Sequence, residues 1–320
     1  MTVLAENRVA PAVRLGKRIS GATNIQEALA NAGLDGEVKV SENPVSTPII
    51  TELGVTNLVI PDKFITYRTM PATGELKPLG VVGNRYVPIQ DSEAFDFLNL
   101  VVDETGASVE GVGTMAGGKQ TVMYIKMPNS IKVGGYDQVD LNLMAHNSHD
   151  GSTAFTVAVT PMRLFCTNQV RMALKTSKSK ISLKHTFGAK AKVAQARETL
   201  GLVFDYQEAF ELEVERLLAQ EFDTDQFTKL VETLLPLDKA NASKAQITKT
   251  EEAYSTLNGL WYADTQATIF GTKWAAYNAV AEYADWFKPV RGGQDKELIR
   301  AERIVSGASD ELKNRALALL

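Results

Sequence analysis

The sequence predicts an α+β protein, with a mainly antiparallel β-sheet and packed helices in the N-terminal half and a helical C-terminal half. Short β-rich runs broken by turn residues dominate the first half, and apolar residues at helical spacing dominate the second. The composition, 44% hydrophobic and 22% charged, is that of a globular chain. The expected parts are a flexible N-terminal arm at 1–45, a β/α core domain with a basic C-terminal segment at 46–190, and a helical domain at 191–320.

The N-terminal arm shows no sustained period, since Gly, Asn, Ser and Pro interrupt it. Within it, NIQEALANAG predicts a short helix capped by Asn24 and ended by Gly33. The following stretch, TNLVIPDKFITYRTMPATGELKPLGVVGNRYVPIQ, predicts short strands separated by Pro-Asp, Ala-Thr-Gly and Gly-Asn turns.

One helix is expected over DSEAFDFLNLVVDETG, with Asp91 or Ser92 as its cap and Gly106 as its end. Its apolar face would consist of Phe95, Leu98 and Val101 or Val102. SVEGVGTM and QTVMYIKM then predict two strands joined by an AGGK turn.

The next hairpin is expected around NSHDGS, because Asp-Gly is a strong turn signal. Alternation in DLNLMAH and TAFTVAVT predicts one inward face on each flanking strand, made of Leu141, Leu143 and Ala145 before the turn and Phe155, Val157 and Val159 after it. The residues of this turn are Asn147, His149, Asp150, Gly151 and Ser152. We expect the turn to present Asn147, His149 and Ser152, so His149→Ala would leave the melting temperature nearly unchanged.

The helical half begins with one long helix over residues 191–220, kinked near Gly201. A helix capped by Asp223 follows, and then helices near 245–258, 272–286, 295–305 and 309–319. Trp274 and Tyr277 share a helical face, which favours packing within a bundle over a ligand site.

No metal site, cofactor site or catalytic residue is expected, and the chain is not predicted to be an enzyme. His146, His149, Asp150 and Cys166 do not have the ligand spacing of a structural zinc site. Cys166 with His149 as a base lacks an orienting third group and an oxyanion-binding device. GGKQT and VRGGQDK lack the context of a phosphate-binding loop.

Charge segregation is the largest departure in composition. The net charge is −4, yet residues 151–197 contain nine Lys/Arg and no Asp/Glu. Ser, Thr, Asn and Gln are interleaved there, and all of them can bind phosphate oxygens. The residues expected to bind nucleic acid are Arg163, Asn168, Arg171, Lys175, Lys178, Lys180, Lys184, Phe187, Lys190 and Lys192. A solvated loop and helix surface is the alternative, and Phe155, Phe165 and Phe187 would either stack on bases or belong to the core.

Four segments carry a resemblance to a family of phage- and plasmid-borne proteins that contain a domain of unknown function. They are PLGVVGNRYVPIQDSEAFDFL, NSHDGSTAFTVAVTPMRLFCTN, and GTKWAAYNAVAEYADW with AERIVSGASDELKNRALALL. The resemblance implies a mobile-element protein of the bacterial cytoplasm without an established reaction. The order of strands and helices is also similar to that of Rad52-like single-strand annealing proteins.

The expected function is therefore nucleic-acid binding, of single-stranded DNA, in mobile-element recombination or replication. The alternative is a protein–protein interaction factor, counter-defence or regulatory, whose basic segment meets an acidic partner; a hydrolase built on His149, Asp150 and Cys166 ranks last. The absence of a signal-peptide core and of a long apolar run predicts a cytoplasmic protein of the bacterial host without a membrane partner. The sequence does not decide whether the nucleic acid is DNA or RNA. It does not give the oligomeric state either, so a homo-oligomer stays open.

Overall fold

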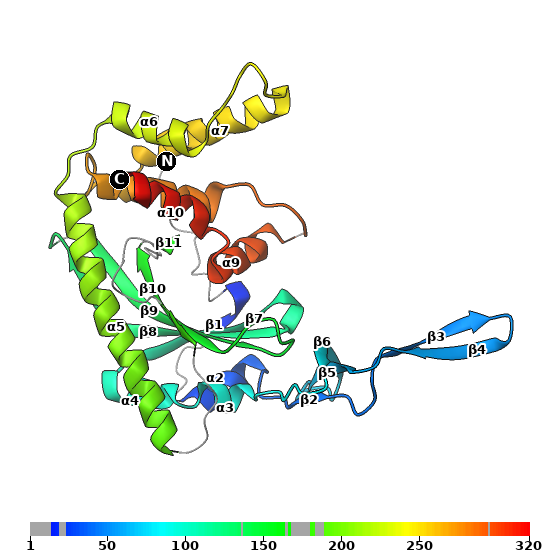
Figure 1. Cartoon of the computed structure of the whole chain (residues 1–320). Coiled ribbons are helices and arrows are strands. Elements are labelled where there is room, and N and C mark those ends of the chain that lie inside the picture. The colour runs from blue at the N-terminus through cyan, green and yellow to red at the C-terminus, as the bar shows by residue number, and fades with distance from the viewer. Residues whose placement is uncertain are drawn as a thin grey trace.

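The structure is a computed structural model that describes residues 14–18, 24–135, 137–163, 166–167, 180–182, 189–293 and 295–320. The predicted α+β class is confirmed: antiparallel sheets occupy the N-terminal half and helices the C-terminal half (Figure 1). None of the helices in these ranges is long and apolar enough to cross a membrane.

A seven-stranded antiparallel sheet is the centre of the described part. Its strand order is β1-β7-β8-β9-β10-β11, and β12 pairs with β10 as well. The strands are β1 Gly16–Arg18, β7 Ser108–Met115, β8 Gln120–Val133, β9 Asp137–Ser148, β10 Thr156–Arg163, β11 Cys166–Thr167 and β12 Lys180–Ser182. The predicted turn between β7 and β8 is confirmed as a short 3-10 segment, Ala116–Gly118.

Two smaller sheets lie at the side of the main sheet. β2 (Val38–Val40), β5 (Lys63–Thr69) and β6 (Leu76–Gly83) form a three-stranded sheet. β3 (Ser46–Thr51) and β4 (Gly54–Val59) form a separate hairpin, which extends away from the rest of the molecule (Figure 1).

Short helices cover one end of the main sheet. α2 (Ile25–Ala32) begins where the Asn24 side chain accepts a hydrogen bond from the Glu27 amide at 2.8 Å, and ends at Gly33 in the left-handed conformation, as predicted. Although the sequence places α2 in the flexible arm, its apolar face is buried in the main core.

The prediction of a single helix over residues 91–106 is wrong in one respect. The structure breaks it into α3 (Asp91–Phe95) and α4 (Leu98–Thr105). Gln90 occupies the N-cap position of α3 without a side-chain cap bond, so Asp91 is not the cap. The expected end at Gly106 is confirmed by its left-handed conformation.

The main sheet buries both faces. Its first face belongs to the large core, in which the predicted inward residues of β9 and β10 are all buried. The cluster of buried apolar residues on its second face is smaller. In this cluster Met144 and Ala158 pack with Val305 of helix α9 (Lys296–Ser306). The predicted alternation along these strands is therefore confirmed.

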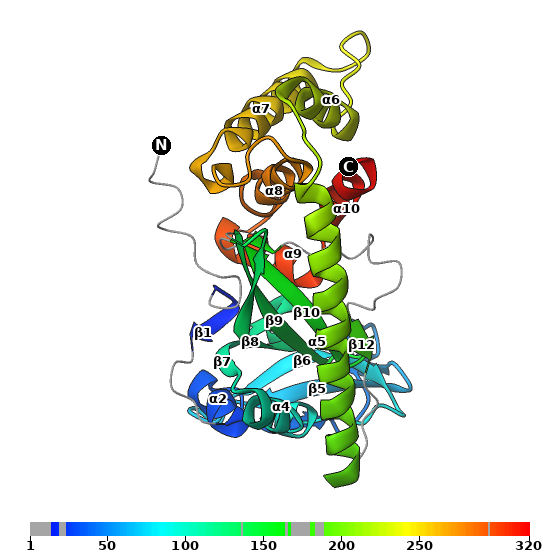
Figure 2. The same ribbon diagram turned by 90° about the vertical axis from the view of Figure 1, so that its left-hand side faces the viewer.

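The long helix α5 (Ala189–Leu218) connects the sheet to the helical half and runs beside both (Figure 2). The remaining helices are α6 Thr224–Leu234, α7 Lys244–Trp261, the 3-10 turn Asp264–Gln266, α8 Lys273–Glu282 with a π-helical extension Tyr283–Phe287, and α10 Asp310–Leu319. Asp223 caps α6 as predicted. Trp274 stacks on Tyr277 at 5.6 Å between ring centroids, and its indole N–H donates to Asp137 of β9 at 2.8 Å. These aromatic residues therefore serve helix packing, as predicted.

Candidate functional site

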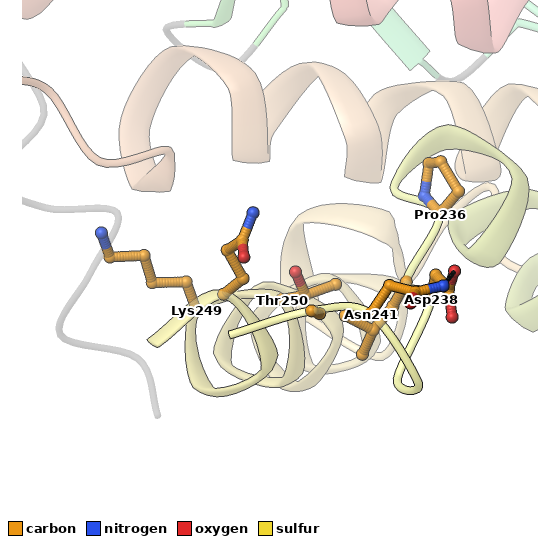
Figure 3. A pocket seen from close by; sticks show the side chains of 8 residues that line it. Pro236, Asp238, Asn241, Lys249 and Thr250 are labelled. Atoms are coloured by element: carbon orange, nitrogen blue, oxygen red, sulfur yellow. Dashed lines mark hydrogen bonds between the residues drawn. The ribbon is translucent and has the colours of Figure 1, made fainter. Parts of the chain in front are cut away.

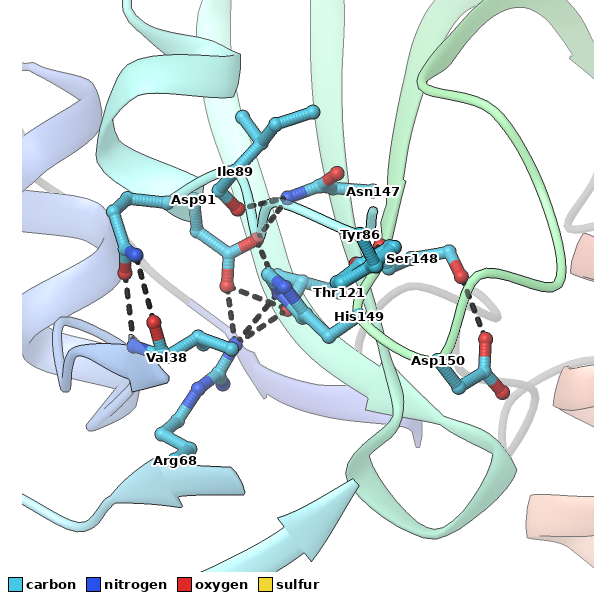
Figure 4. A network of polar contacts seen from close by, with 11 residues as sticks. Val38, Arg68, Tyr86, Ile89, Asp91, Thr121, Asn147, Ser148, His149 and Asp150 are labelled. Atoms are coloured by element: carbon cyan, nitrogen blue, oxygen red, sulfur yellow. Dashed lines mark hydrogen bonds and ion pairs between the residues drawn. The ribbon is translucent and has the colours of Figure 1, made fainter. Parts of the chain in front are cut away.

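A buried polar network joins the two larger sheets and helix α3 (Figure 4). Its centre is the carboxylate of Asp91, the first residue of α3. Arg68 reaches it from β5, Thr121 from β8, and Asn147 and His149 from the end of β9 and the residue after it. All five side chains are at most 4% exposed.

Each oxygen of the Asp91 carboxylate accepts two contacts. Oδ2 lies 2.5 Å from Nη2 of Arg68 and 2.7 Å from the hydroxyl of Thr121. Oδ1 lies 2.8 Å from the amide nitrogen of Asn147 and 2.9 Å from Nε2 of His149. The carboxylate is therefore satisfied by charge-assisted hydrogen bonds, the stronger class in proteins.

The His149 ring has one defined role in this network. Its Nε2 atom also lies 3.0 Å from Nη2 of Arg68, but a nitrogen that donates to a carboxylate cannot also accept from Arg68. Arg68 already has Asp91 and Thr121 as acceptors and does not need His149 as a third. We therefore place a proton on Nε2 of His149, where it donates to Asp91. The Nδ1 atom of His149 has no hydrogen-bond partner within the described ranges.

The charge on Asp91 is retained despite burial. Burial by itself would raise the pKa of the Asp91 carboxyl, but His149, Arg68 and Asn147 together lower this pKa below its ordinary value. The resulting carboxylate neutralises the buried Arg68 guanidinium. Because the five side chains expose almost no surface, we assign this network a structural role in holding the small sheet against the main sheet.

The turn after β9 differs from the sequence expectation. Asn147 and His149 were expected on its surface, but they are 2% and 0% exposed, so that expectation is wrong. The turn itself is confirmed at the next residues: Gly151 has a φ of 73°, and Asp150 accepts from the Ser152 amide at 3.0 Å. Of the three residues expected to be presented, Ser152 alone is exposed. Strand parity is the signal that was available, since Asn147 and His149 continue the inward series of β9.

This burial reverses the expected effect of His149→Ala. The substitution removes a donor from Asp91 and leaves an unfilled space, at a cost of about 2–3 kcal/mol. The melting temperature measured by circular dichroism should fall by several degrees. Ser152→Ala, later in the same turn and exposed, should change it little. Equal melting temperatures for His149→Ala and Ser152→Ala would refute the structural role of His149.

A second polar feature is a pocket of about 450 Å³ between the main sheet and α9. Met115, Met144, Ala158 and Val305 supply its apolar lining, and its remaining lining residues are Gln120, His146, Thr153, Ala154, Thr156, Lys180, Ser182 and Ser306. Lys180 of β12 is exposed there. None of these lining residues carries a carboxylate.

His146 is fixed within this pocket lining. Its Nε2 atom lies 3.1 Å from the Gln120 side-chain oxygen, and Gln120 in turn donates to Ser152 at 3.0 Å. Burial lowers the pKa of His146, and the nearby carboxylates of Asp150 and Asp91 oppose this effect only in part. The pocket therefore presents neutral hydrogen-bonding groups beside the cation of Lys180.

Most residues expected to bind nucleic acid fall outside the described residues. Those wholly outside are Asn168, Arg171, Lys175, Lys178, Lys184 and Phe187. Arg163, Lys190 and Lys192 are described in their backbone alone, at the end of β10 and the start of α5, as is Cys166 in β11. At Lys180–Ser182, within the basic segment, the chain is a strand.

The structure decides the alternative for one of the aromatic residues. Phe155 is buried against Phe95 and Phe97, at centroid distances of 5.6 and 6.1 Å, so it belongs to the core and does not stack on bases. Within the described ranges, no group of three or more His, Cys, Asp or Glu residues is placed to hold a metal ion.

A further pocket, of about 440 Å³, lies between the loop that joins α6 to α7 and the first turns of α7 (Figure 3). Pro236, Asp238, Asn241, Lys249 and Thr250 are among its lining residues. Asp238 already accepts from the Asn241 side chain at 2.7 Å and the Ala240 amide at 3.0 Å. This loop is thus held by its own hydrogen bonds, and we assign the pocket no binding role.

Comparison with models of protein families gives a match. A family model described as Domain of unknown function (DUF932) matches residues 78–305, more than two thirds of the chain. The matched range includes Asp91, the β9–β10 turn and the basic segment, and it excludes the β3–β4 hairpin. No curated protein and no solved structure matches the chain.

Proposed function

The chain belongs to the DUF932 family, and from that premise we propose that it is a non-enzymatic nucleic-acid-binding protein of the phage and plasmid type. The proposed ligand is single-stranded DNA, in recombination or replication. The observation that carries the proposal is the segment 151–197, with nine basic and no acidic residues. Residues 198–320 contain 13 basic and 21 acidic residues, so the positive potential is local.

The described strands support a binding surface beside the main sheet. β10, β11, β12 and the start of α5 all belong to, or border, the basic segment, and β11 and β12 both pair with β10. This pairing holds the segment to the sheet at several points, which limits the ordering entropy lost when a ligand binds.

The pocket next to β12 supports the same proposal. Phosphate oxygens accept hydrogen bonds from Lys, Ser, Thr and Gln, and the pocket combines Lys180 with Gln120, Thr156 and other neutral donors. Because its lining has no carboxylate, a polyanion would meet no direct charge repulsion there.

The test is the salt dependence of oligonucleotide binding. Each cation that contacts a phosphate contributes a slope of about −0.7 to log Kobs against log salt concentration for single strands. Replacing Lys175, Lys178, Lys180 and Lys184 together by Gln should flatten the slope by about three units and weaken binding to all sequences alike. Fluorescence anisotropy across a salt series measures both effects.

A matched control removes four charges elsewhere. Lys229, Lys239, Lys244 and Lys249 are all exposed on the acidic helical half, and replacing them by Gln should leave the slope unchanged. If both variants lose affinity equally, net charge and not the basic segment governs binding.

Phe187→Ala should weaken single-strand binding more than duplex binding, because unpaired bases alone can stack on it.

The second candidate is a protein–protein interaction factor, counter-defence or regulatory. The same basic segment, residues 151–197, favours this class, because an acidic partner protein would be attracted to it as well. Wild-type protein that binds no oligonucleotide at low salt would refute the first proposal and leave this one.

A further inference from the structure

The β3–β4 hairpin is an arm that extends away from the rest of the molecule (Figure 1). All residues of both strands are exposed, and Ile50, Leu53 and Val55 reach 86%, 100% and 70%. Backbone hydrogen bonds at its base tie it to β5: the Val45 amide donates to the Lys63 carbonyl at 2.7 Å. An isolated two-stranded hairpin is at best marginally stable in water, so this arm needs a partner surface.

The chemistry of the arm is that of an interface. Seven apolar residues project from it: Ile49, Ile50, Leu53, Val55, Leu58, Val59 and Ile60. In residues 46–60 the one charged residue is Glu52, at the tip. Exposed strand edges in proteins are usually protected by charged residues, above all Lys, and this protection is missing here.

A complementary surface lies at the base of the arm. Ile65 of β5 pairs with Val81 of β6, and both are exposed. The opposite face of this small sheet is buried and carries Arg68. Lys63, at the start of β5, adds an exposed cation at the same place.

We propose that two copies of the chain associate through these arms about a twofold axis. The arms lie antiparallel, so the tip of each arm reaches the exposed β5–β6 face of the partner subunit. The Ile50–Val55 face of each arm is then covered, and the arm's Glu52 meets Lys63 of the partner subunit. A surface that carries both members of each contact is self-complementary, which is the requirement for a twofold interface.

The area and reach of the arm favour a second copy as the occupant. The seven exposed apolar side chains of one arm form a continuous run along the hairpin, and a standard-size interface covers about 800 Å² on each partner. Six residues per strand make the arm about 20 Å long, and because it extends away from its own β5–β6 face, it cannot cover that face itself. Reciprocal exchange covers both surfaces of both copies at once.

The first experiment measures the molecular mass in solution by sedimentation velocity over a concentration series. Wild-type protein should be a dimer, and Ile50→Lys with Val55→Lys should weaken association about 100-fold. Since these side chains contact no core, the far-ultraviolet circular dichroism spectrum of the folded variant should match wild type, and its melting temperature should fall only by the stabilisation that the partner subunit supplied. Leu212→Lys, at an exposed apolar position on α5 far from the arm, is the matched control and should remain a dimer.

The second experiment tests the twofold arrangement by exchanging charges. Glu52→Lys and Lys63→Glu should each weaken self-association, because each variant places like charges at the tip contact. A mixture of the two single variants should form heterodimers, since every tip contact then joins opposite charges. A monomeric wild type, a dimer unaffected by Ile50→Lys with Val55→Lys, or a mixture that fails to associate would each overturn the proposal.

Discussion

Asp91→Ala is expected to destabilise the folded chain by about 3–5 kcal/mol, the typical cost of removing one partner of a buried ion pair. The substitution leaves the Arg68 guanidinium, which is 2% exposed, without its carboxylate. It also takes away the acceptor of Thr121, Asn147 and His149. Since domains are stable by about 5–15 kcal/mol in total, this loss is a large share.

Urea unfolding followed by circular dichroism measures the effect as a lower transition midpoint. Glu251→Ala is the control, because Glu251 pairs with Lys239 at 3.1 Å on the surface, and such pairs contribute at most about 1 kcal/mol. Asp91→Leu combined with Arg68→Met should recover part of the loss, since no unpaired buried charge remains. A midpoint for Asp91→Ala equal to that of Glu251→Ala would exclude the network as a structural element.

The same carboxylate sets an acid dependence. The pKa of Asp91 is lowered in the folded state, so its stabilisation is complete above the ordinary pKa of 3.8 and is lost as pH falls through the folded value. Wild-type stability should therefore decline in this acid range, and the decline should be smaller in the combined Asp91→Leu and Arg68→Met variant.

Local signals in the sequence predicted much of the fold. Asn24 and Asp223 cap helices because their side chains accept from amides three residues ahead, a contact that depends on local sequence alone. The alternation of inward and outward residues along a strand also depends on local sequence alone, and it placed Leu143 and Val157 in the core. The break between α3 and α4 was missed, since the apolar spacing of that segment continues through it.

The buried network could be predicted only in part. Parity along β9 points Asn147 and His149 inward, but the Asp-Gly turn signal next to them suggested exposure. Their common partner is more than 50 residues away, as the contacts of Asn147 and His149 with Asp91 show. Asp91 by itself has the appearance of a helix cap. Such pairing depends on tertiary structure, and no local pattern encodes it.

The arm shows a different limit of sequence reasoning. Apolar strand residues at Ile49–Ile50 and Leu58–Ile60 have the composition of a core strand, and the TNLVIPD segment was expected to be an ordinary strand. Whether such a strand is covered by its own chain or by another copy depends on the position of the whole hairpin. The structure places it outside the core of its own chain.

A second buried charge, Lys313 of α10, is expected to be as important for the helical half. It is 0% exposed, and its Nζ atom lies 2.7 Å from Asp285 and 3.4 Å from Asp310. Burial raises the pKa of the neighbouring Tyr277 hydroxyl well above its usual value, and Asp310 and Asp285 add to this effect. The surroundings of Lys313 are therefore rich in negative charge, and its ammonium group pairs with two of these carboxylates.

Lys313→Met keeps the aliphatic stem and removes the cation, so two buried carboxylates lose their counter-charge, at a cost of about 3–5 kcal/mol. Tryptophan fluorescence reports the loss directly, because Trp261, Trp274 and Trp286 all lie in the helical half. Lys239→Met, the same change in an exposed ion pair, should cost less than about 1 kcal/mol. Adding Asp285→Asn to Lys313→Met should restore part of the stability, because one buried negative charge that Lys313 no longer offsets is then gone. A further, additive loss in the double variant would mean that Lys313 stabilises the bundle by packing and not by charge.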